Sequence, residues 1–185
     1  MKKGSVIIFP TDTIYGMASK LYDKVGLERI MDIKKRDENK QIPVLISDLV
    51  SINLIAKYDS KSLEVMTTFW PGALTVILDT TPEFCKKTGE KTVALRIPNH
   101  YLAIELIHQF GPLRTTSVNI SGESPLNTYQ EVTDKFGDVV DKIYGEHVND
   151  YIGVASTVID LTNSEIKLIR EGAIPFSDIL EVYNK

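Results

Sequence analysis

Short apolar segments that end abruptly at proline or at polar residues constrain the fold of this chain most. Such segments stand at 5–9, 43–47, 73–79 and 92–97, and each has the length and residue types of a buried strand. Segments with apolar residues at helical spacing lie between them. Strands and helices therefore mix without strict alternation, which favours an α/β fold with a twisted, mixed sheet. We expect a single domain over residues 1–185.

The other elements follow from apolar spacing and from capping residues. We expect helices at 23–35, 60–70 and 100–110, and further strands at 114–120, 139–144, 154–161 and 165–170. Asp23 is the expected N-cap of the first helix, Thr128 with Glu131 forms a capping-box pattern, and Ser177 is expected to cap a last short helix. The helix at 60–70 is expected to turn one face inward, carrying Leu63, Met66 and Trp70.

Composition excludes several classes of protein. With 43% hydrophobic and 25% charged residues, a chain of 185 residues can bury a real core. A net charge of −4 argues against a protein whose main function is to bind the phosphate backbone of nucleic acids. The single cysteine, Cys85, excludes an internal disulfide and a multi-cysteine zinc site, which suits a reducing cytoplasm.

Apolar runs in the chain are too short for export or for membrane insertion. The run that follows the first lysines covers only residues 6–9 and stops at Pro10, whereas a signal peptide needs about 7–15 apolar residues. No stretch approaches the roughly 20 apolar residues of a membrane helix. We therefore expect a soluble, cytoplasmic protein with no membrane partner.

Six polar clusters stand at predicted strand or helix ends, where α/β proteins commonly bind ligands. They are PTDTIYG at 10–16, KKR at 34–36 with Lys40, Arg96 within VALRIP, TTSVNISG at 115–122, ASTV at 155–158, and REG at 170–172. The hydroxyls and glycine of the first cluster can line a pocket floor, although a hydroxyl-rich turn has the same composition. Cations grouped at a helix end suit a triphosphate, although the helix dipole alone also favours them.

Arg96 is the most informative of these residues, because an arginine within an apolar strand is costly to bury unpaired. Its planar guanidinium suits a carboxylate held by two hydrogen bonds. The partner can be a ligand in a wet cleft, in which case removing Arg96 costs little stability. The partner can also be an internal carboxylate, in which case removal costs about 3–5 kcal/mol. We expect the ligand to be the partner.

The strand at 114–120 places Thr115, Ser117 and Asn119 on one face by simple alternation. An amphipathic edge strand would have the same pattern. The chain has no phosphate-binding Walker loop, no nucleophile elbow, no zinc-binding H-E-x-x-H and no dinucleotide fingerprint. Three histidines, at 100, 108 and 147, do not form a recognisable Ser-His-Asp set.

Taken together and in order, these motifs resemble the YrdC-like family, the L-threonylcarbamoyladenylate synthases. The resemblance runs from Phe9 to Gly172 through FPTDTIYG, KKRDENK, FWPGALTVIL, ALRIP, TTSVNISG, ASTVID and IREG. It implies a mostly open, mixed β-sheet flanked by helices around a concave site. It also implies a nucleotidyltransferase that joins L-threonine, bicarbonate or CO2 and ATP to give threonylcarbamoyl-AMP and pyrophosphate.

The resemblance assigns roles to particular residues. L-threonine would contact Thr13, Arg96, Thr115 and Ser156, with Arg96 on the carboxylate. ATP would contact Lys34, Arg36, Lys40, Thr92, Ser117, Asn119 and Arg170, with Lys34 and Arg36 as the catalytic cations. Mg²⁺ would arrive with ATP, held mostly by phosphates and water, since the sequence suggests no carboxylate cage. The product would pass to a downstream tRNA threonylcarbamoyl-transferase complex for the t6A modification, with a weak tRNA contact at most.

The sequence departs from the family pattern at several positions. Asp37 stands where a proline commonly follows K-x-R, and Leu45 stands near the place of a histidine that many relatives have. Val118 replaces the alanine of the usual S-A-N. The chain begins almost on the first strand and ends shortly after IREG, as in the short, single-domain type.

Two other functions are compatible with the same motifs. The fold can serve as a tRNA or double-stranded RNA binding module without synthase activity, although the acidic net charge counts against it. A related carbamoyl-transfer enzyme carries this fold as one domain of a much larger chain. The short length and the lack of zinc-finger cysteines argue against that alternative.

Overall fold

The computed structural model describes residues 1–35, 41–146, 153–163 and 165–185, and among them nine strands form one sheet. In sheet order the strands are β7 (Lys142–Ile143), β1 (Ile7–Phe9), β2 (Gly16–Lys20), β6 (Leu113–Ser117), β3 (Val44–Leu45), β5 (Thr92–Arg96), β4 (Leu74–Asp79), β8 (Thr157–Asp160) and β9 (Lys167–Arg170). Three neighbouring pairs, β7–β1, β3–β5 and β4–β8, are parallel, and the other five are antiparallel. The predicted mixed sheet is thus confirmed.

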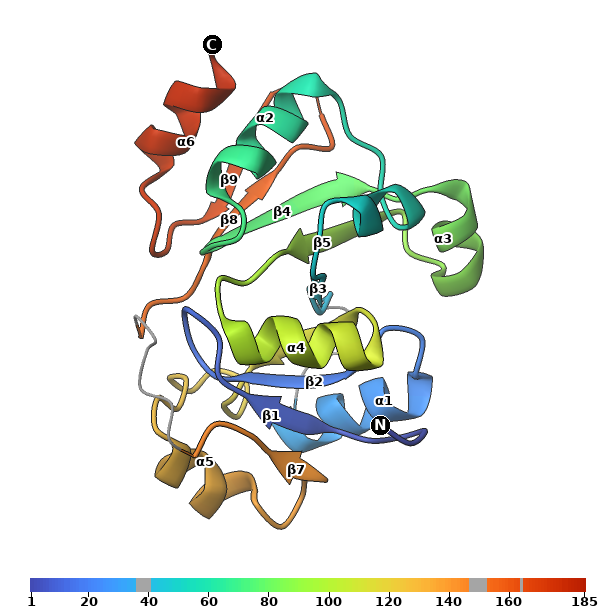
Figure 1. Ribbon diagram of the computed structural model, residues 1–185, viewed down its shortest axis with the longest axis vertical. Coiled ribbons are helices and arrows are strands. Elements are labelled where there is room, and N and C mark those ends of the chain that lie inside the picture. Colours follow the sequence, from blue (N-terminus) through green and yellow to red (C-terminus); the bar gives the residue numbers. More distant parts are fainter. Residues whose placement is uncertain (36–40, 147–152, 164) are drawn as a thin grey trace.

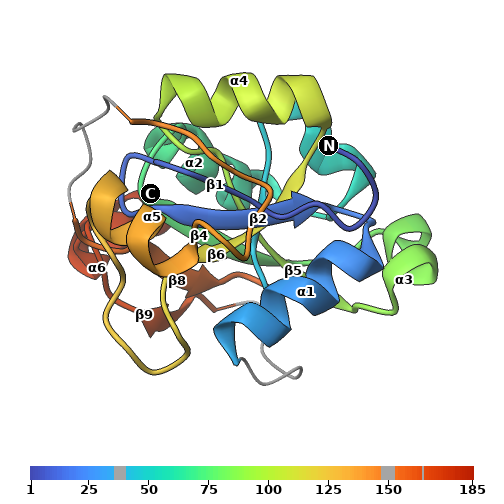
Figure 2. The ribbon, with the colours of Figure 1, turned by 90° about the horizontal axis from the view of Figure 1, so that it is seen from below.

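Helices cover the sheet on both sides (Figures 1 and 2). They are α1 (Lys24–Lys34), the 3-10 helix η1 (Val50–Leu54), α2 (Ser60–Phe69), α3 (Pro82–Thr88), α4 (Tyr101–Phe110), α5 (Tyr129–Phe136) and α6 (Phe176–Tyr183). Figure 2 shows α4 on one side of β1 and β2, with α1 and α5 on the other. None of the helices in the described part of the chain is long and apolar enough to cross a membrane.

Alternation along β1 explains why helices pack on both of its faces. Ile7 and Phe9 belong to a core cluster with Ala103 and Leu106 of α4. Ile8, one residue out of phase, belongs to a different cluster with residues of α1 and α5. Because successive side chains of a strand point to opposite faces, a short strand that is apolar throughout requires cover on both sides.

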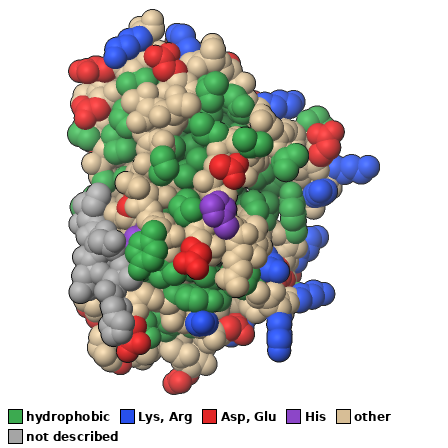
Figure 3. Space-filling view, in the orientation of Figure 1, with side chains coloured by type: hydrophobic (Ala, Val, Ile, Leu, Met, Phe, Trp, Pro, Cys, Tyr) green, Lys and Arg blue, Asp and Glu red, His purple; other side chains and the backbone are tan. Residues whose placement is uncertain are grey.

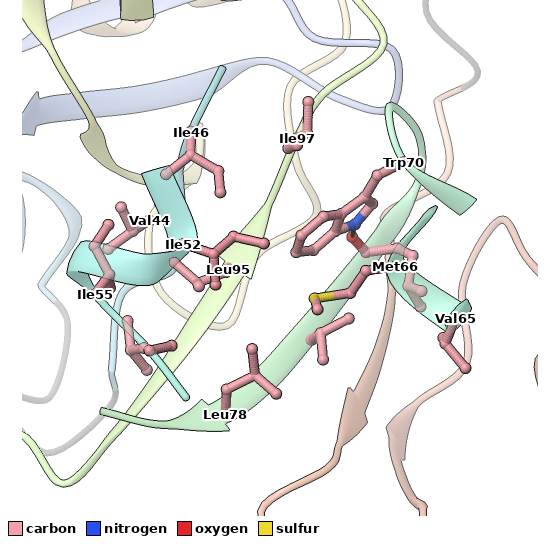
Figure 4. Packing of buried hydrophobic residues seen from close by; sticks show 14 of the residues in the cluster. Val44, Ile46, Ile52, Ile55, Val65, Met66, Trp70, Leu78, Leu95 and Ile97 are labelled. Carbon is pink, nitrogen blue, oxygen red and sulfur yellow. Dashed lines mark hydrogen bonds between the residues drawn. The ribbon is translucent and has the colours of Figure 1, made fainter. Parts of the chain in front are cut away.

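A third and larger core lies under α2, η1 and α6, against β3, β4, β5 and β8 (Figure 4). Trp70 packs there among apolar side chains that include Met66 and Leu95, and its indole N–H donates to the Leu74 carbonyl at 2.7 Å. That hydrogen bond satisfies the one polar atom of a buried tryptophan side chain. The core thereby fixes one face of β4 and β5 and leaves the other face to the cavity described below.

Several local predictions are confirmed and others are wrong. Asp23 caps α1, accepting from Gly26 N, and Thr128 with Glu131 forms a full capping box on α5. Ser177 is not a cap, because α6 begins one residue earlier, after Pro175. Leu63 does not point inward. It is 36% exposed, because Ser62, Val65 and Met66 form the buried face of α2.

Strand β2 and helix α3 were not predicted. The segment of β2 reads GMASK, which lacks the β-branched, apolar run typical of a strand. It becomes a strand because β1 and β6 pair with it on its two edges. Helix α3 has readable local signals in the capping Thr81, Pro82 at its start and Gly89 at its end, but it is only seven residues long.

Replacing Asp59, the N-cap of α2, with alanine should lower the free energy of unfolding by about 1 kcal/mol near pH 7. The hydrogen bond from Ser62 N lowers the pKa of Asp59 below its ordinary value of 3.8. A lowered pKa in the folded state adds stability above the unfolded pKa and loses it as pH falls through the folded pKa. Urea unfolding of both proteins at pH 7 and pH 2.5 should show the difference shrinking in acid. A difference that grows in acid would contradict this.

Candidate active site

A cavity of about 370 Å³ opens on the faces of β4 and β5 that point away from the core under α2. Alternation along the two strands divides their side chains between core and cavity. Leu74, Val76 and Leu95 pack in the core. The cavity is lined by Thr75, Ile77, Ala94 and Arg96. The same apolar strands that build the interior therefore also supply the cavity wall.

Hydroxyl groups and two arginines dominate the polar part of the cavity. Apart from Tyr15, the hydroxyls belong to Thr11, Thr13, Thr75, Thr115, Thr116, Ser117 and Ser156. The arginines are Arg96 and Arg170, and the lining that the structure describes contains no carboxylate. Burial lowers the pKa of Arg96, Asp12 opposes that shift, and the nearby charge of Arg170 adds to it. Two cations that share a cavity favour an anionic ligand there.

Arg96, at the end of β5, is 6% exposed and is fixed by three contacts. Its Nη2 forms an ion pair with Asp12 Oδ1 at 2.5 Å, Nη1 donates to Thr13 Oγ1 at 2.8 Å, and Nε donates to the Gly72 carbonyl at 2.9 Å. The sequence-based expectation of an incompletely paired cation in a wet cleft is therefore wrong. An internal carboxylate neutralises Arg96, because the turn after β1 brings Asp12 beside the end of β5.

These contacts still leave Arg96 able to bind a ligand. A guanidinium has five N–H donors, and the three contacts above use one each of Nε, Nη1 and Nη2. Because Arg96 also lines the cavity, its remaining donors suit a second acceptor. Asp12 holds the guanidinium plane in place before any ligand arrives, which reduces the ordering that binding would otherwise require.

The turn between β1 and β2 is held by its own hydroxyls. Thr11 Oγ1 donates to the Ile14 carbonyl at 2.6 Å, and it accepts from the backbone N–H groups of Thr13 and Ile14. The hydroxyls of Thr11 and Thr13 lie 3.0 Å apart. The hydroxyl-rich turn and the pocket floor, which the sequence left as alternatives, are thus the same structure.

The opposite wall joins two distant segments. Ser156 Oγ lies 2.8 Å from Thr75 Oγ1, and Arg170 Nη2 donates to the Ser156 carbonyl at 2.7 Å. A Cβ on Gly172 would stand 2.2 Å from the Ala155 carbonyl oxygen, so only glycine permits this crossing. Burial lowers the pKa of Arg170. The REG segment therefore packs against the ASTV segment, and this packing places Arg170 at the cavity.

Lys34 and Asn119 lie behind the cavity wall. Lys34, 1% exposed at the end of α1, donates to the Ser117 carbonyl, and to the carbonyl and Oδ1 of Asn119, both at 2.8 Å. Ser117 Oγ also donates to Asn119 Oδ1 at 2.7 Å. This network ties the end of α1 to the turn after β6. It holds in place the side chain of Ser117, which does line the cavity.

Part of the lining is apolar. It consists of Ile14, Pro43, Leu45, Ile77, Ala94, Ala155, Val158 and Ile169, along with the partly polar ring of Tyr15. Leu45, which by the resemblance stands near the place of a histidine, is buried and belongs to the core cluster with α4. Gln41 lines the cavity, and its side-chain amide donates to the Thr92 carbonyl at 2.8 Å. Thr92 is therefore connected to the cavity through Gln41 without lining it.

The structure brings most of the predicted site residues together. Those that line the cavity are Thr13, Arg96, Thr115, Ser117, Ser156 and Arg170. Lys34, Asn119 and Thr92 are not in its lining but contact residues that are. Arg36 and Lys40 lie outside the described residues, so their roles stay predictions. The roles of all these residues toward ligands also stay predictions.

Sequence reasoning assigned no role to several polar residues of the site, which are Asp12, Thr75, and Thr11, Gln41 and Thr116 of the lining. Asp12 stands within the quoted PTDTIYG motif but received no role, although an arginine in an apolar strand was a signal to search for a carboxylate. Thr75 stands within FWPGALTVIL, and the apolar residues around it make the segment look like an ordinary buried strand. Leu74 and Val76 on either side of it face the core, so Thr75 faces the cavity, and this can be recognised only once the core-facing residues of β4 are known.

Comparisons with known proteins find relatives for nearly the whole chain. The family profile Sua5/YciO/YrdC, whose description is "Telomere recombination", matches residues 1–172. The threonylcarbamoyl-AMP synthase of Pyrococcus abyssi is 33% identical over 188 residues, covering 98% of this chain and 54% of that protein. This chain therefore spans about half the length of that relative.

Solved structures show the same arrangement of elements. The crystal structure of P. abyssi Sua5 complexed with L-threonine superimposes with a TM-score of 0.88 at 32% identity, over 97% of this chain and 54% of that one. The crystal structure of E. coli YciO superimposes with a TM-score of 0.85 at 28% identity, over 96% of this chain and 87% of that one. Both neighbours are mixed α/β proteins with a large open sheet flanked by helices.

Proposed function

This chain belongs to the Sua5/YciO/YrdC family, and from that premise we propose that it is a threonylcarbamoyl-AMP synthase. The reaction consumes L-threonine, bicarbonate and ATP and gives threonylcarbamoyl-AMP, pyrophosphate and water. One observation supports it most directly: the described cavity lining combines seven serine and threonine side chains with two arginines and has no carboxylate. Such a lining suits small anions that carry hydroxyl groups.

The threonine carboxylate is assigned to Arg96. That guanidinium is already oriented by Asp12 and Thr13, and it has donors beyond those contacts. The hydroxyls of Thr13, Thr115 and Ser156 line the same cavity, so they can surround the rest of the amino acid. Bicarbonate takes up a proton and loses water to give CO2. This placement leaves the amine of threonine free to add to that CO2, which forms an N-carboxylate and releases the amine proton.

The second step transfers AMP to that N-carboxylate. Its oxygen attacks the α-phosphorus of ATP, the bond to the β-phosphate oxygen breaks, and pyrophosphate leaves. No covalent intermediate with the protein forms, so alignment and charge neutralisation are sufficient. ATP is assigned to Ser117, Asn119, Thr92 and Arg170, with Arg36 and Lys40 on the phosphates. Lys34 supports the turn that carries Ser117 and Asn119.

Mg²⁺ is proposed to enter bound to ATP and to neutralise phosphate charge. The parts of the chain that the structure describes contain no group of three or more His, Cys, Asp or Glu side chains placed to hold a metal. The described cavity lining also has no acidic side chain. These residues fit a metal carried by the nucleotide and water rather than one held by a protein cage.

We place the reaction in the cytoplasm, because a chain with a single cysteine cannot form an internal disulfide and therefore suits a reducing compartment. The product, a reactive mixed anhydride, would pass to a tRNA threonylcarbamoyl-transferase complex. A direct contact with tRNA would be weak, given the net charge of −4.

The decisive experiment is pyrophosphate release from purified protein. We expect release that requires ATP, L-threonine and bicarbonate together. Reactions that lack one of the three substrates are the controls. If the chain is instead an RNA-binding module, no release will occur, and duplex RNA will bind with a steep salt dependence. That pair of results would overturn the synthase assignment.

L-Threonine should be preferred over L-valine by about 5- to 150-fold in kcat/KM. Valine has nearly the same shape but lacks the hydroxyl, and a buried hydroxyl-binding site left unpaired costs about 1–3 kcal/mol. Competing rates of pyrophosphate release measure the ratio. The Ser156→Ala protein, which loses the hydroxyl beside Thr75, should discriminate less. Equal rates with the two amino acids in the wild-type protein would contradict this placement.

A further inference from the structure

A second and larger hollow lies away from the active-site cavity. It measures about 820 Å³, and none of the residues that line it also lines the active-site cavity. It is formed by the N-terminal residues, the turn from β2 into α1, the helix η1 and the turn after α4. We call it the lysine-rimmed groove, after Lys3, Lys20 and Lys24 in its lining.

The groove exposes apolar side chains that a monomer would ordinarily cover. Leu21 and Ile55 are buried in its floor, while Tyr22, Val25 and Leu54 are 52%, 46% and 76% exposed. Single exposed apolar residues are common on protein surfaces, but exposed apolar residues that converge on one hollow mark a binding surface. This convergence requires tertiary structure, because the three exposed residues come from the β2–α1 turn, α1 and η1.

The charge of the groove is opposite to that of the whole protein. Three lysines line it against one carboxylate, that of Asp23, in a protein of net charge −4. Asp23 is already engaged, since it accepts from Gly4 N at 2.6 Å and from Gly26 N at 3.1 Å. Lys87 adds a further cation 5.3 Å from the centre of the Tyr22 ring. Figure 3 shows lysine and arginine side chains along the edge that carries α1 and α3.

We propose that the lysine-rimmed groove docks an acidic, amphipathic peptide segment of a partner protein. Apolar side chains of that segment would contact Leu21, Tyr22 and Leu54, and its Asp or Glu residues would meet the lysines at the rim. The apolar floor favours a peptide over a nucleic acid duplex, because the sugars and phosphates on the outside of a duplex offer no apolar side chains to cover Val25 and Leu54. Because the groove and the active-site cavity share no lining residue, a docked partner leaves the cavity open.

The test uses a synthetic peptide of about 15 residues with leucine at i, i+3, i+4 and i+7 and mostly glutamate elsewhere. One matched peptide carries lysine in place of glutamate, and another carries serine in place of leucine. Titration of the full, isotope-labelled chain, followed by amide NMR shifts, should show saturable shifts at residues 2–3, 20–25, 51–55 and 110–111. Only the glutamate–leucine peptide should produce them, and added salt should weaken its binding.

Variants then test which contacts carry binding. Leu54→Asp, and separately the double variant Lys20→Glu/Lys24→Glu, should each weaken peptide binding at least about tenfold. Both should fold, because Leu54 is largely exposed and Lys20 is the partly exposed last residue of β2. A glutamate at position 24 lies in the first turn of α1, where it suits the helix dipole. Matched controls at exposed positions outside the groove, Tyr101→Asp and Lys167→Glu, should bind within twofold of wild type.

Three outcomes would overturn the proposal. One is the absence of shifts in the groove with the acidic peptide, or equal shifts with the lysine peptide. Another is that a duplex RNA, rather than the peptide, perturbs these amides. The last is a self-association of the chain alone that Leu54→Asp abolishes, which would make a second copy the occupant. The proposal does not depend on synthase activity, since its readout is binding.

Discussion

Replacing Arg96 with alanine should cost both fold stability and substrate binding. Removing the guanidinium leaves the carboxylate of Asp12 buried without its ion-pair partner, which costs about 3–5 kcal/mol of unfolding free energy. The same change removes two charge-assisted hydrogen bonds proposed for the threonine carboxylate. At about 1.5–3 kcal/mol each, their loss amounts to at least about a hundredfold in threonine affinity. Urea unfolding and threonine titration measure the two effects separately.

The Arg96→Lys protein separates stability from recognition. A lysine keeps a positive charge for Asp12 but lacks the planar fork that holds two acceptors at once. We expect it to recover most of the stability that alanine loses while binding threonine poorly. If Arg96→Ala melts like the wild-type protein, the pair with Asp12 does not stabilise the fold. If either variant binds threonine normally, Arg96 does not hold the carboxylate.

Replacing Lys34 with methionine should destabilise the protein by about 2–4 kcal/mol. Methionine fills the space of the lysine stem but leaves the Ser117 carbonyl and two oxygens of Asn119 without this donor. The turn after β6 would lose its attachment to α1, so the KM for ATP should also rise severalfold. Urea unfolding and the ATP dependence of pyrophosphate release measure these effects.

The exposed Lys24, on the same helix, provides the matched control. Lys24→Met should change the free energy of unfolding by less than about 0.5 kcal/mol, as expected for a surface substitution. A Lys34→Met protein that unfolds like the wild type but no longer binds ATP would contradict the positioning role. It would place the ammonium directly on the phosphates, as the family resemblance implies.

Local patterns were enough to predict much of the framework. The Asp23 cap and the Thr128–Glu131 capping box depend on residues three apart, so the sequence contains all the information they need. The apolar strands β1, β4 and β5 were located for the same reason, with boundaries displaced by one or two residues. The order of the polar motifs was likewise sufficient for the family and the mixed sheet.

Only the tertiary structure decided how those motifs meet. Arg96 and Asp12 are 84 residues apart, and Thr75 and Ser156 are 81 apart. Nothing local specifies either contact. Strand β2 exists because two neighbours pair with it, and its pairing with β1 and β6 sets where the turn at Asp12 lies. The sequence thus determined which residues could carry charge and hydroxyls. The sheet register determined which charges neutralise one another, because a shift of one residue would turn each side chain to the opposite face.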